Sequence, residues 1–185
     1  MNYLYRHPEK VETLIKELQK EDHTASFLEV LKTHHHDTFA HSIRVAKLSI
    51  DLALENNLPI KVVRVIGHAA LLHDFGKTKI DRKILSKSEP LNWWEKLIMK
   101  WHPQLGLSEL RGVVSQEIRV IIASHHRPID AMTEIVSAAD MYDALSSPRA
   151  YKDGFDLEKV EAIMLEQFSG KKILIDQLTK IPRGF

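Results

Sequence analysis

The sequence contains no cysteine. It therefore forms no disulfide bond and offers no thiolate to a metal ion, so nitrogen and oxygen atoms are its strong candidate ligands. A chain without cysteine also suits a reducing compartment, because nothing in it needs oxidation to fold. We expect a cytoplasmic protein.

Long apolar stretches are absent as well. The first ten residues include Arg6, Glu9 and Lys10, where a secretory signal needs an apolar run. No later stretch approaches the length of about 20 apolar residues that a membrane-spanning helix requires. We expect a soluble protein with no membrane partner.

Neither sign of charge is in clear excess. The 26 Lys and Arg residues almost balance the 25 Asp and Glu residues, which leaves a net charge of +1. Proteins that bind nucleic acid usually carry a marked basic excess, so we expect no nucleic-acid polymer as a partner. Any basic site must be local.

Glycine and proline are scarce, with seven of each in 185 residues. They lie between segments of helical periodicity and not inside them, which predicts an all-α fold. The length suits one core, and we find no repeat or low-complexity linker. We expect a single domain over residues 1–185, in which helices within 8–33 and 156–181 pack on a motif-bearing part at about 36–152.

Capping residues and apolar periodicity define the expected helices. Thr24 is expected to cap the second of them. An irregular connection is expected over 76–90 and a turn at His102-Pro103. The expected helical ranges are 8–20, 24–33, 38–57, 59–73, 93–101, 115–125, 131–145, 156–168 and 171–179.

Histidine is the residue in surplus, with 11 in the chain. Several predicted helices continue an apolar ridge into residues that bind protons or metals: His41, His73 with Asp74, His125 with His126, and Asp140. Burying an unpaired charge costs several kcal/mol, so inward side chains of this kind are best explained if they meet around metal ions. Imidazole and carboxylate donors suit Mn, Fe, Ni or Zn.

A single inward histidine is more often a hydrogen-bonded core residue than a metal ligand. The ordered series is more specific than its members, because the sequence contains His-Asp-x-Gly-Lys, His-Pro-x-x-Gly, His-His and Asp-x-x-Asp-Ala-Leu in that order. Core histidines that arose independently would not be followed by these residues. The series as a whole therefore favours a metal cluster.

The same series resembles the HD-GYP family, within the HD superfamily of metal-dependent phosphohydrolases. The resemblance implies a helical HD-domain bundle with a buried His/Asp metal cluster. The segments that carry it are His41-Ser-Ile-Arg-Val45, His73-Asp74-Phe-Gly76-Lys77, His102-Pro-Gln-Leu-Gly106, His125-His126 and Asp140-Met-Tyr-Asp143-Ala-Leu-Ser-Ser-Pro-Arg149-Ala-Tyr-Lys152.

The resemblance also implies a division of the ligands between two divalent ions. Asp74 would bridge them, because a carboxylate has two oxygens to offer. Asp37 lies where trinuclear members carry a glutamate that helps to hold a third metal, and the alternative is that Asp37 caps the third helix. We expect two ions, or three, with Fe or Mn favoured over Ni or Zn. The implied sets are His41, His73, Asp74 and Asp140 for one ion, and His102, His125 and His126 for the other.

Asp74 and Lys77 are the expected catalytic residues. Two ions bridged by Asp74 can hold a water molecule as hydroxide near neutral pH. Lys77 follows the flexible Gly76 and can place an ammonium group beside the phosphoryl oxygens as charge builds up. The alternative for Lys77 is an exposed loop lysine.

Three further residues have expected roles. The resemblance gives Arg149 and Lys152 a role in binding substrate phosphates, and the alternative is that they are surface charges. Lys77 is expected to bind the substrate as well, through the ammonium position described above. Asp143, one turn after Asp140, is expected to orient a histidine or Lys77, and the alternative is a salt bridge on the helix surface.

One departure from the family pattern concerns the substrate side. The family follows its paired histidines with Glu and a glycine-rich loop that contains Gly-Tyr-Pro. Here His126 leads through Arg127-Pro-Ile-Asp130 directly into the next helix, and only Asp130 remains of that pattern. The expected metal ligands are intact.

The resemblance implies a phosphodiesterase acting on a small nucleotide-type substrate such as cyclic di-GMP, by means of metal-activated bridging hydroxide. The missing loop leaves a second hypothesis, a general HD nucleotidase or phosphatase. A third is a metal-binding sensor or interaction domain without catalysis. Trp93, Trp94 and Trp101 are interpreted as packing residues, with Trp93 or Trp94 beside a substrate base as the alternative.

Overall fold

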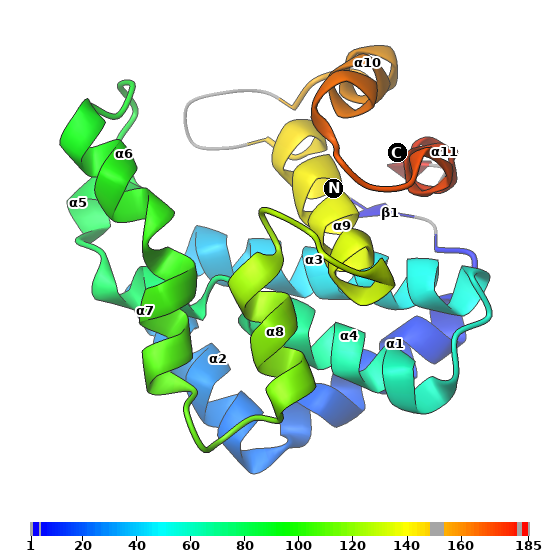
Figure 1. Cartoon of the computed structure of the whole chain (residues 1–185), viewed down its shortest axis with the longest axis horizontal. Coiled ribbons are helices and arrows are strands. Elements are labelled where there is room, and N and C mark those ends of the chain that lie inside the picture. Colours follow the sequence, from blue (N-terminus) through cyan, green and yellow to red (C-terminus); the bar gives the residue numbers. More distant parts are fainter. Residues whose placement is uncertain (1, 4, 149–153, 181–182, 185) are drawn as a thin grey trace.

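A computed structural model describes residues 2–3, 5–148, 154–180 and 183–184. Their regular structure is helical, except for an antiparallel pair of two-residue strands, β1 (Asn2–Tyr3) and β2 (Arg183–Gly184), that brings the two ends of the chain together (Figure 1). The expected all-α fold is confirmed. The helices are α1 (Pro8–Lys20), α2 (Asp22–His34), α3 (His36–Glu55), α4 (Ile60–Leu72), the 3-10 helix η1 (Phe75–Lys79), α5 (Arg82–Leu85), α6 (Trp93–Lys100), α7 (His102–Glu109), α8 (Gln116–Ser124), α9 (Ala131–Ser146), α10 (Leu157–Gln167) and α11 (Lys172–Thr179).

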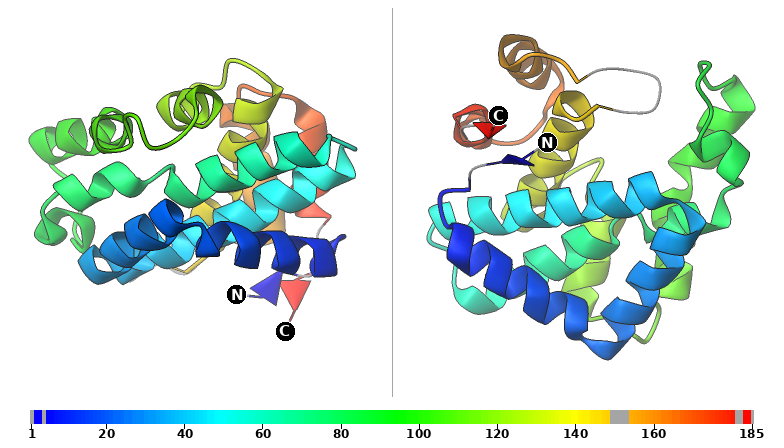
Figure 2. Two further views of the ribbon diagram at one scale, coloured as in Figure 1. Left: turned by 90° about the horizontal axis from the view of Figure 1, so that it is seen from below. Right: turned by 180° about the vertical axis from the view of Figure 1, so that it is seen from behind.

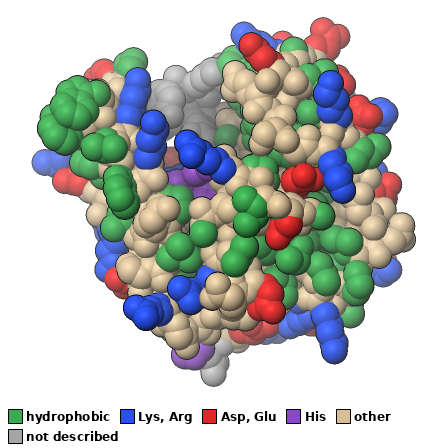
Figure 3. All heavy atoms as spheres, in the orientation of Figure 1, with side chains coloured by type: hydrophobic (Ala, Val, Ile, Leu, Met, Phe, Trp, Pro, Cys, Tyr) green, Lys and Arg blue, Asp and Glu red, His purple; other side chains and the backbone are tan. Residues whose placement is uncertain are grey.

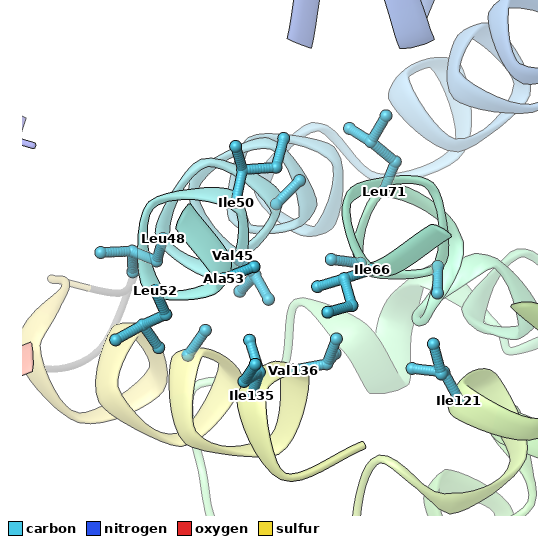
Figure 4. Close-up of a cluster of buried hydrophobic side chains, with 14 of the residues drawn as sticks. Val45, Leu48, Ile50, Leu52, Ala53, Ile66, Leu71, Ile121, Ile135 and Val136 are labelled. Carbon is cyan, nitrogen blue, oxygen red and sulfur yellow. The ribbon is translucent and has the colours of Figure 1, made fainter. Parts of the chain in front are cut away.

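The core lies where α3 and α4 pack against each other and against α8 and α9. Val45, Ile66 and Val136 point toward one another there and are fully buried (Figure 4). Each such side chain contributes about 1.5–3 kcal/mol by leaving water. Buried residues of α1, α2, α10 and α11 belong to the same hydrophobic cluster. This shared core supports the expected single-domain organisation, which stays a prediction.

Helix α7 stands where we expected only a turn, and this part of the expectation is wrong. Pro103 lies within its first helical turn. Proline is compatible with that position because a backbone N–H there has no partner inside the helix. The connection expected over 76–90 is also partly helical, since it contains most of η1 and all of α5.

Two expected helix caps are wrong. Thr24 lies inside α2 and is buried, with its hydroxyl 2.6 Å from His68 Nε2. At the start of α3 the cap is His35, whose Nδ1 accepts a hydrogen bond from the backbone N–H of Thr38 at 3.2 Å. Asp37 therefore does not cap this helix and lies exposed in its first turn.

Helices α5 and α6 together project from the rest of the fold (Figure 1), and neither contains a buried residue. Figure 2 shows the same arrangement from two further sides. The interpretation of the tryptophans of α6 as packing residues is wrong, since Trp93 is 64% exposed and Trp94 and Trp101 are also exposed. The Trp93 and Trp94 rings stack on each other at 3.7 Å. No helix in the described part of the chain combines the length and the apolar character needed to cross a membrane.

Gly76 brings η1 against α7. A Cβ atom at this position would lie 1.8 Å from the carbonyl oxygen of His102 and 2.5 Å from the backbone nitrogen of Gly106. Only a residue without a side chain permits this contact between two backbones. The contact places Asp74, just before η1, next to His102 at the start of α7.

We predict that Gly76→Ala lowers the free energy of unfolding in urea by about 3 kcal/mol or more, because neither backbone can move without repacking the core. Gly112→Ala is the matched control. Gly112 has a φ of 79° and open space around it, so alanine there costs only about 1 kcal/mol. Equal losses in the two variants would contradict the close contact.

Candidate metal centre

The expected ligands other than Asp37 lie close together, and all of them except His126 are buried or nearly so. They come from α3, α7 and α9 and from the ends of α4 and α8. The side chains form three groups, and within each group the nitrogen and oxygen atoms that could bind an ion all lie within 4.8 Å of one another. Donors that share one ion at 2.0–2.2 Å lie about 3–4 Å apart, so each group is close enough together to hold a metal ion after small side-chain movements. The groups are His41 with His73 and Asp74, His73 with His125 and Asp140, and His102 with His125 and His126.

Three of the histidine rings are oriented by the helices that precede them. His73, His102 and His125 each follow the last turn of a helix, where carbonyl groups lack partners within the helix. Each Nδ1–H donates to such a carbonyl, and a carbonyl can only accept. Each Nε2 is therefore left as a lone pair that faces the cluster. The acceptors are the carbonyl oxygens of Ala70, Met99 and Ile122, at 2.8, 2.7 and 2.8 Å.

His41 is oriented by a carboxylate in place of a carbonyl group. Its Nδ1–H donates to Asp143 Oδ2 at 2.7 Å, and Asp143 also accepts from Arg44 Nε at 2.7 Å and Nη2 at 2.9 Å. Burial opposes ionisation of Asp143, but His41 and Arg44 hold the pKa of its carboxyl group well below the ordinary value. Asp143 is buried, so the alternative of a surface salt bridge is wrong.

The electrostatics of the cluster suit a bound cation. Burial lowers the pKa of His102 and of His125 to about 4, so both rings are neutral near pH 7. Burial also disfavours a charge on His41, yet hydrogen bonds to Asp140 and Asp143 raise its pKa to about 9. The carboxylates thus create a site where positive charge is stabilised, and the neutral rings supply lone pairs to it.

Asp74 faces both halves of the cluster. Its Oδ2 lies 3.5 Å from His73 Nε2 and 3.7 Å from His41 Nε2, whereas its Oδ1 lies 3.2 Å from His102 Nε2. Lys77 Nζ donates to Oδ2 at 2.6 Å. Burial opposes ionisation, but Lys77 and the histidines hold the pKa of Asp74 well below its ordinary value.

Comparison with known proteins identifies the family. The model of the HD domain matches residues 38–147, which contain every residue of the cluster. The chain belongs to the HD domain family. The expected membership of the HD superfamily is thereby confirmed, and proteins with this domain bind divalent metal ions.

Three curated relatives of this HD domain are phosphodiesterases by name. The chain is 33% identical to a cyclic di-GMP phosphodiesterase of Pseudomonas aeruginosa, over 74% of its own length and 37% of the relative's. It is 35% identical to a cyclic di-GMP phosphodiesterase of Thermotoga maritima, over 73% and 41%. It is 29% identical to the 3'3'-cGAMP-specific phosphodiesterase 1 of Vibrio cholerae, over 71% and 34%. The chain thus spans about two fifths or less of these relatives.

A cavity of about 680 Å³ opens beside the cluster of this HD domain. Its wall includes His41, Lys77, Arg44 and Asp37, and none of the described residues that line it is a tryptophan. Histidine side chains are visible at the bottom of a hollow, next to Lys and Arg side chains (Figure 3). Asp37 borders the cavity without joining any of the three ligand groups, so its role in a third metal site stays a prediction.

Two expected substrate-binding residues, Arg149 and Lys152, lie outside the described residues. Arg44, in contrast, borders the cavity, and no sequence pattern had given it a role. It lies one turn after His41 and reaches Asp143 across 99 positions of sequence. The sequence signal that could have indicated this role is Asp143, because an aspartate buried in a helix bundle needs a cation near it.

We predict that Arg44→Gln weakens metal binding, because Asp143 then loses two hydrogen bonds that fix its orientation toward His41. Loss of such a support typically costs about 10- to 100-fold in metal affinity. Calorimetric titration of the metal-free protein with Mn²⁺ measures this. Lys47→Gln on the same helix is the control, because Lys47 pairs with Glu12 and not with the cluster. Equal affinity in both variants would contradict the role of Arg44.

We also predict that the metal-free protein is most stable near pH 6.5. Below that pH, His102 and His125 become protonated in the unfolded chain but stay neutral in the folded protein, where their pKa is about 4. The free energy of unfolding therefore falls as the pH is lowered toward 4. Above it, His41 retains in the fold a proton that the unfolded chain has released, and this contribution is lost toward pH 9.

Each histidine contributes roughly 3 kcal/mol at full effect, since one pKa unit corresponds to about 1.4 kcal/mol. Urea titrations between pH 4 and pH 9 in the presence of a chelator measure the profile. A free energy of unfolding that stays level across this range would contradict the prediction.

Proposed function

We propose that this HD domain is a metal-dependent phosphodiesterase whose substrate is a cyclic dinucleotide, with cyclic di-GMP as the first candidate. The observation that carries the proposal is the convergence of imidazole and carboxylate donors at the edge of a cavity that also contains the Lys77 ammonium group. The names of the relatives supply the substrate class. The reaction adds the oxygen of water to phosphorus, breaks one P–O ester bond and returns a proton to the released alcohol.

The side chains present fit divalent metal ions. Nε2 of His73 is buried and has no hydrogen-bond partner, although Asp74 Oδ2 and Asp140 Oδ1 lie 3.5 and 3.8 Å away. A buried lone pair without a donor is costly, and an ion would satisfy it. We propose that His41, His73, Asp74 and Asp140 hold one ion, and that His102, His125 and His126 hold a second with Asp74 shared.

The donor set favours Fe or Mn, and Ni or Zn bind similar donors. Bound divalent ions would supply Lewis-acid charge and an activated water molecule. Lys77 has a separate role, because its ammonium group borders the cavity and can stabilise negative charge on the phosphoryl oxygens. It also holds Asp74 ionised through their hydrogen bond.

The short connection between α8 and α9 supports a second candidate, a nucleotidase or phosphatase of broader specificity. Only residues 125–130 join these helices, so no Gly-Tyr-Pro loop covers the substrate side. A site with one wall missing discriminates less between phosphate esters. Hydrolysis rates on cyclic di-GMP, 3'3'-cGAMP and simple nucleoside monophosphates separate the two candidates.

We predict that His73→Ala and Asp74→Asn each remove bound metal and hydrolysis of cyclic di-GMP, because both residues belong to the buried donor set. Lys77→Ala should keep the metal but lower kcat by about 10- to 1000-fold, as for the loss of one group that stabilises transition-state charge. Elemental analysis and single-substrate kinetics measure the two effects separately.

His23→Ala is the matched control, since His23 is an exposed histidine of α2. Lys77→Arg should recover part of the rate because it restores a cation. Full activity and full metal content in Asp74→Asn would show that the proposed function is wrong.

A further inference from the structure

A second, smaller cavity of about 220 Å³ also borders the cluster. It is lined by His125, His126 and Asp140, whereas the larger cavity meets the cluster at His41. The cluster is therefore open to two cavities with different walls. His126 belongs to this second opening, and its side chain is 55% exposed.

The outer wall of the smaller cavity comes from a part of the chain that the HD domain match does not include. Gln167, Phe168 and Ser169 lie at the end of α10 and just beyond it, and the match ends at residue 147. Ser137 and Met141 of α9 complete the lining. The outer wall is therefore built by the chain at the end of α10, C-terminal to the matched HD domain.

The chemistry of this lining suits a nucleobase and not a phosphate. Asp140 is the charged side chain among the described residues that line it, and no Lys or Arg is among them. A phenyl ring offers a stacking surface, and amide and hydroxyl groups match the polar edge of a base.

The ring of Phe168 has packing contacts in addition to its place in the cavity lining. It packs against the hydrophobic core, and it lies so close to Gly170 that a Cβ atom there would be 2.5 Å from Phe168 Cζ. A stacking surface whose position is fixed loses little entropy when a ligand binds. This contact favours a preformed subsite.

We propose that the smaller cavity binds one nucleobase of the substrate, stacked on Phe168, while the larger cavity takes the rest of the molecule and the cluster takes the phosphodiester between them. The proposal rests on the proposed function. The volumes agree with this division, because whole small-molecule ligands occupy about 300–1,000 Å³ and the smaller cavity has room only for a part.

Phe168→Leu tests the subsite, since leucine keeps an apolar side chain on the core but removes the flat ring. We expect KM for cyclic di-GMP to rise about 10-fold, as loss of base stacking on an aromatic side chain does. On methyl p-nitrophenyl phosphate, a phosphodiester without a base, kcat/KM should not change. Phe168→Tyr should restore the wild-type KM, because tyrosine keeps a flat ring. Gln167→Ala should also raise KM for cyclic di-GMP, and because Gln167 is exposed this change leaves the hydrophobic core intact.

Leu165→Ala is the control, because Leu165 is an exposed residue of α10 that does not line the cavity. An unchanged KM in Phe168→Leu and Gln167→Ala, or an equal loss on both substrates, would overturn the subsite. If the wild type hydrolyses neither substrate, the proposed function fails. The subsite is then decided by calorimetry with cyclic di-GMP, where equal dissociation constants for wild type and Phe168→Leu would overturn it.

Discussion

The orientation of four imidazole rings is the constraint on which the centre depends. In each of them the Nδ1–H group is engaged by a fixed acceptor, which is a helix-end carbonyl for three rings and Asp143 for His41. The other nitrogen of each ring then faces the same interior point. Helix ends, which normally leave carbonyl groups unsatisfied, here orient the histidine side chains of the candidate metal centre. The free carbonyl groups at the helix ends thus accept hydrogen bonds that fix the ring orientations before any ligand binds.

The convergence of these residues could be predicted because helical periodicity assigns each side chain to a face. His41, His73, His125 and Asp140 continue apolar ridges, and a residue on such a ridge points into the core wherever the helix packs. The spacing alone therefore identifies most of the cluster. The division of ligands around Asp74 comes from the family resemblance and stays a prediction, although Asp74 Oδ2 faces His41 and Oδ1 faces His102.

Features that depend on contacts between distant segments were missed or wrongly assigned. Arg44 has no local sign of its role, because its partner Asp143 lies on another helix. The tryptophans of α6 follow an amphipathic pattern, and a pattern does not show whether a partner for the apolar face lies within the chain. One wall of the smaller cavity is formed by Gln167, Phe168 and Ser169, which belong to no recognisable sequence motif, so the sequence did not indicate this cavity. Capping preferences also fail where two nearby residues could cap the same helix. At the start of α3 the cap is His35, although aspartate, here Asp37, is the more usual capping residue.

We propose above all that these histidines and aspartates coordinate metal ions together. X-ray absorption spectroscopy of the protein loaded with Mn²⁺ or Fe²⁺ tests it most directly, because outer-shell scattering identifies imidazole ligands. We expect nitrogen and oxygen neighbours at about 2.0–2.2 Å with several imidazole rings, and a second metal at about 3.5–4 Å. A spectrum without imidazole scattering, or a protein that binds neither ion, would contradict the account.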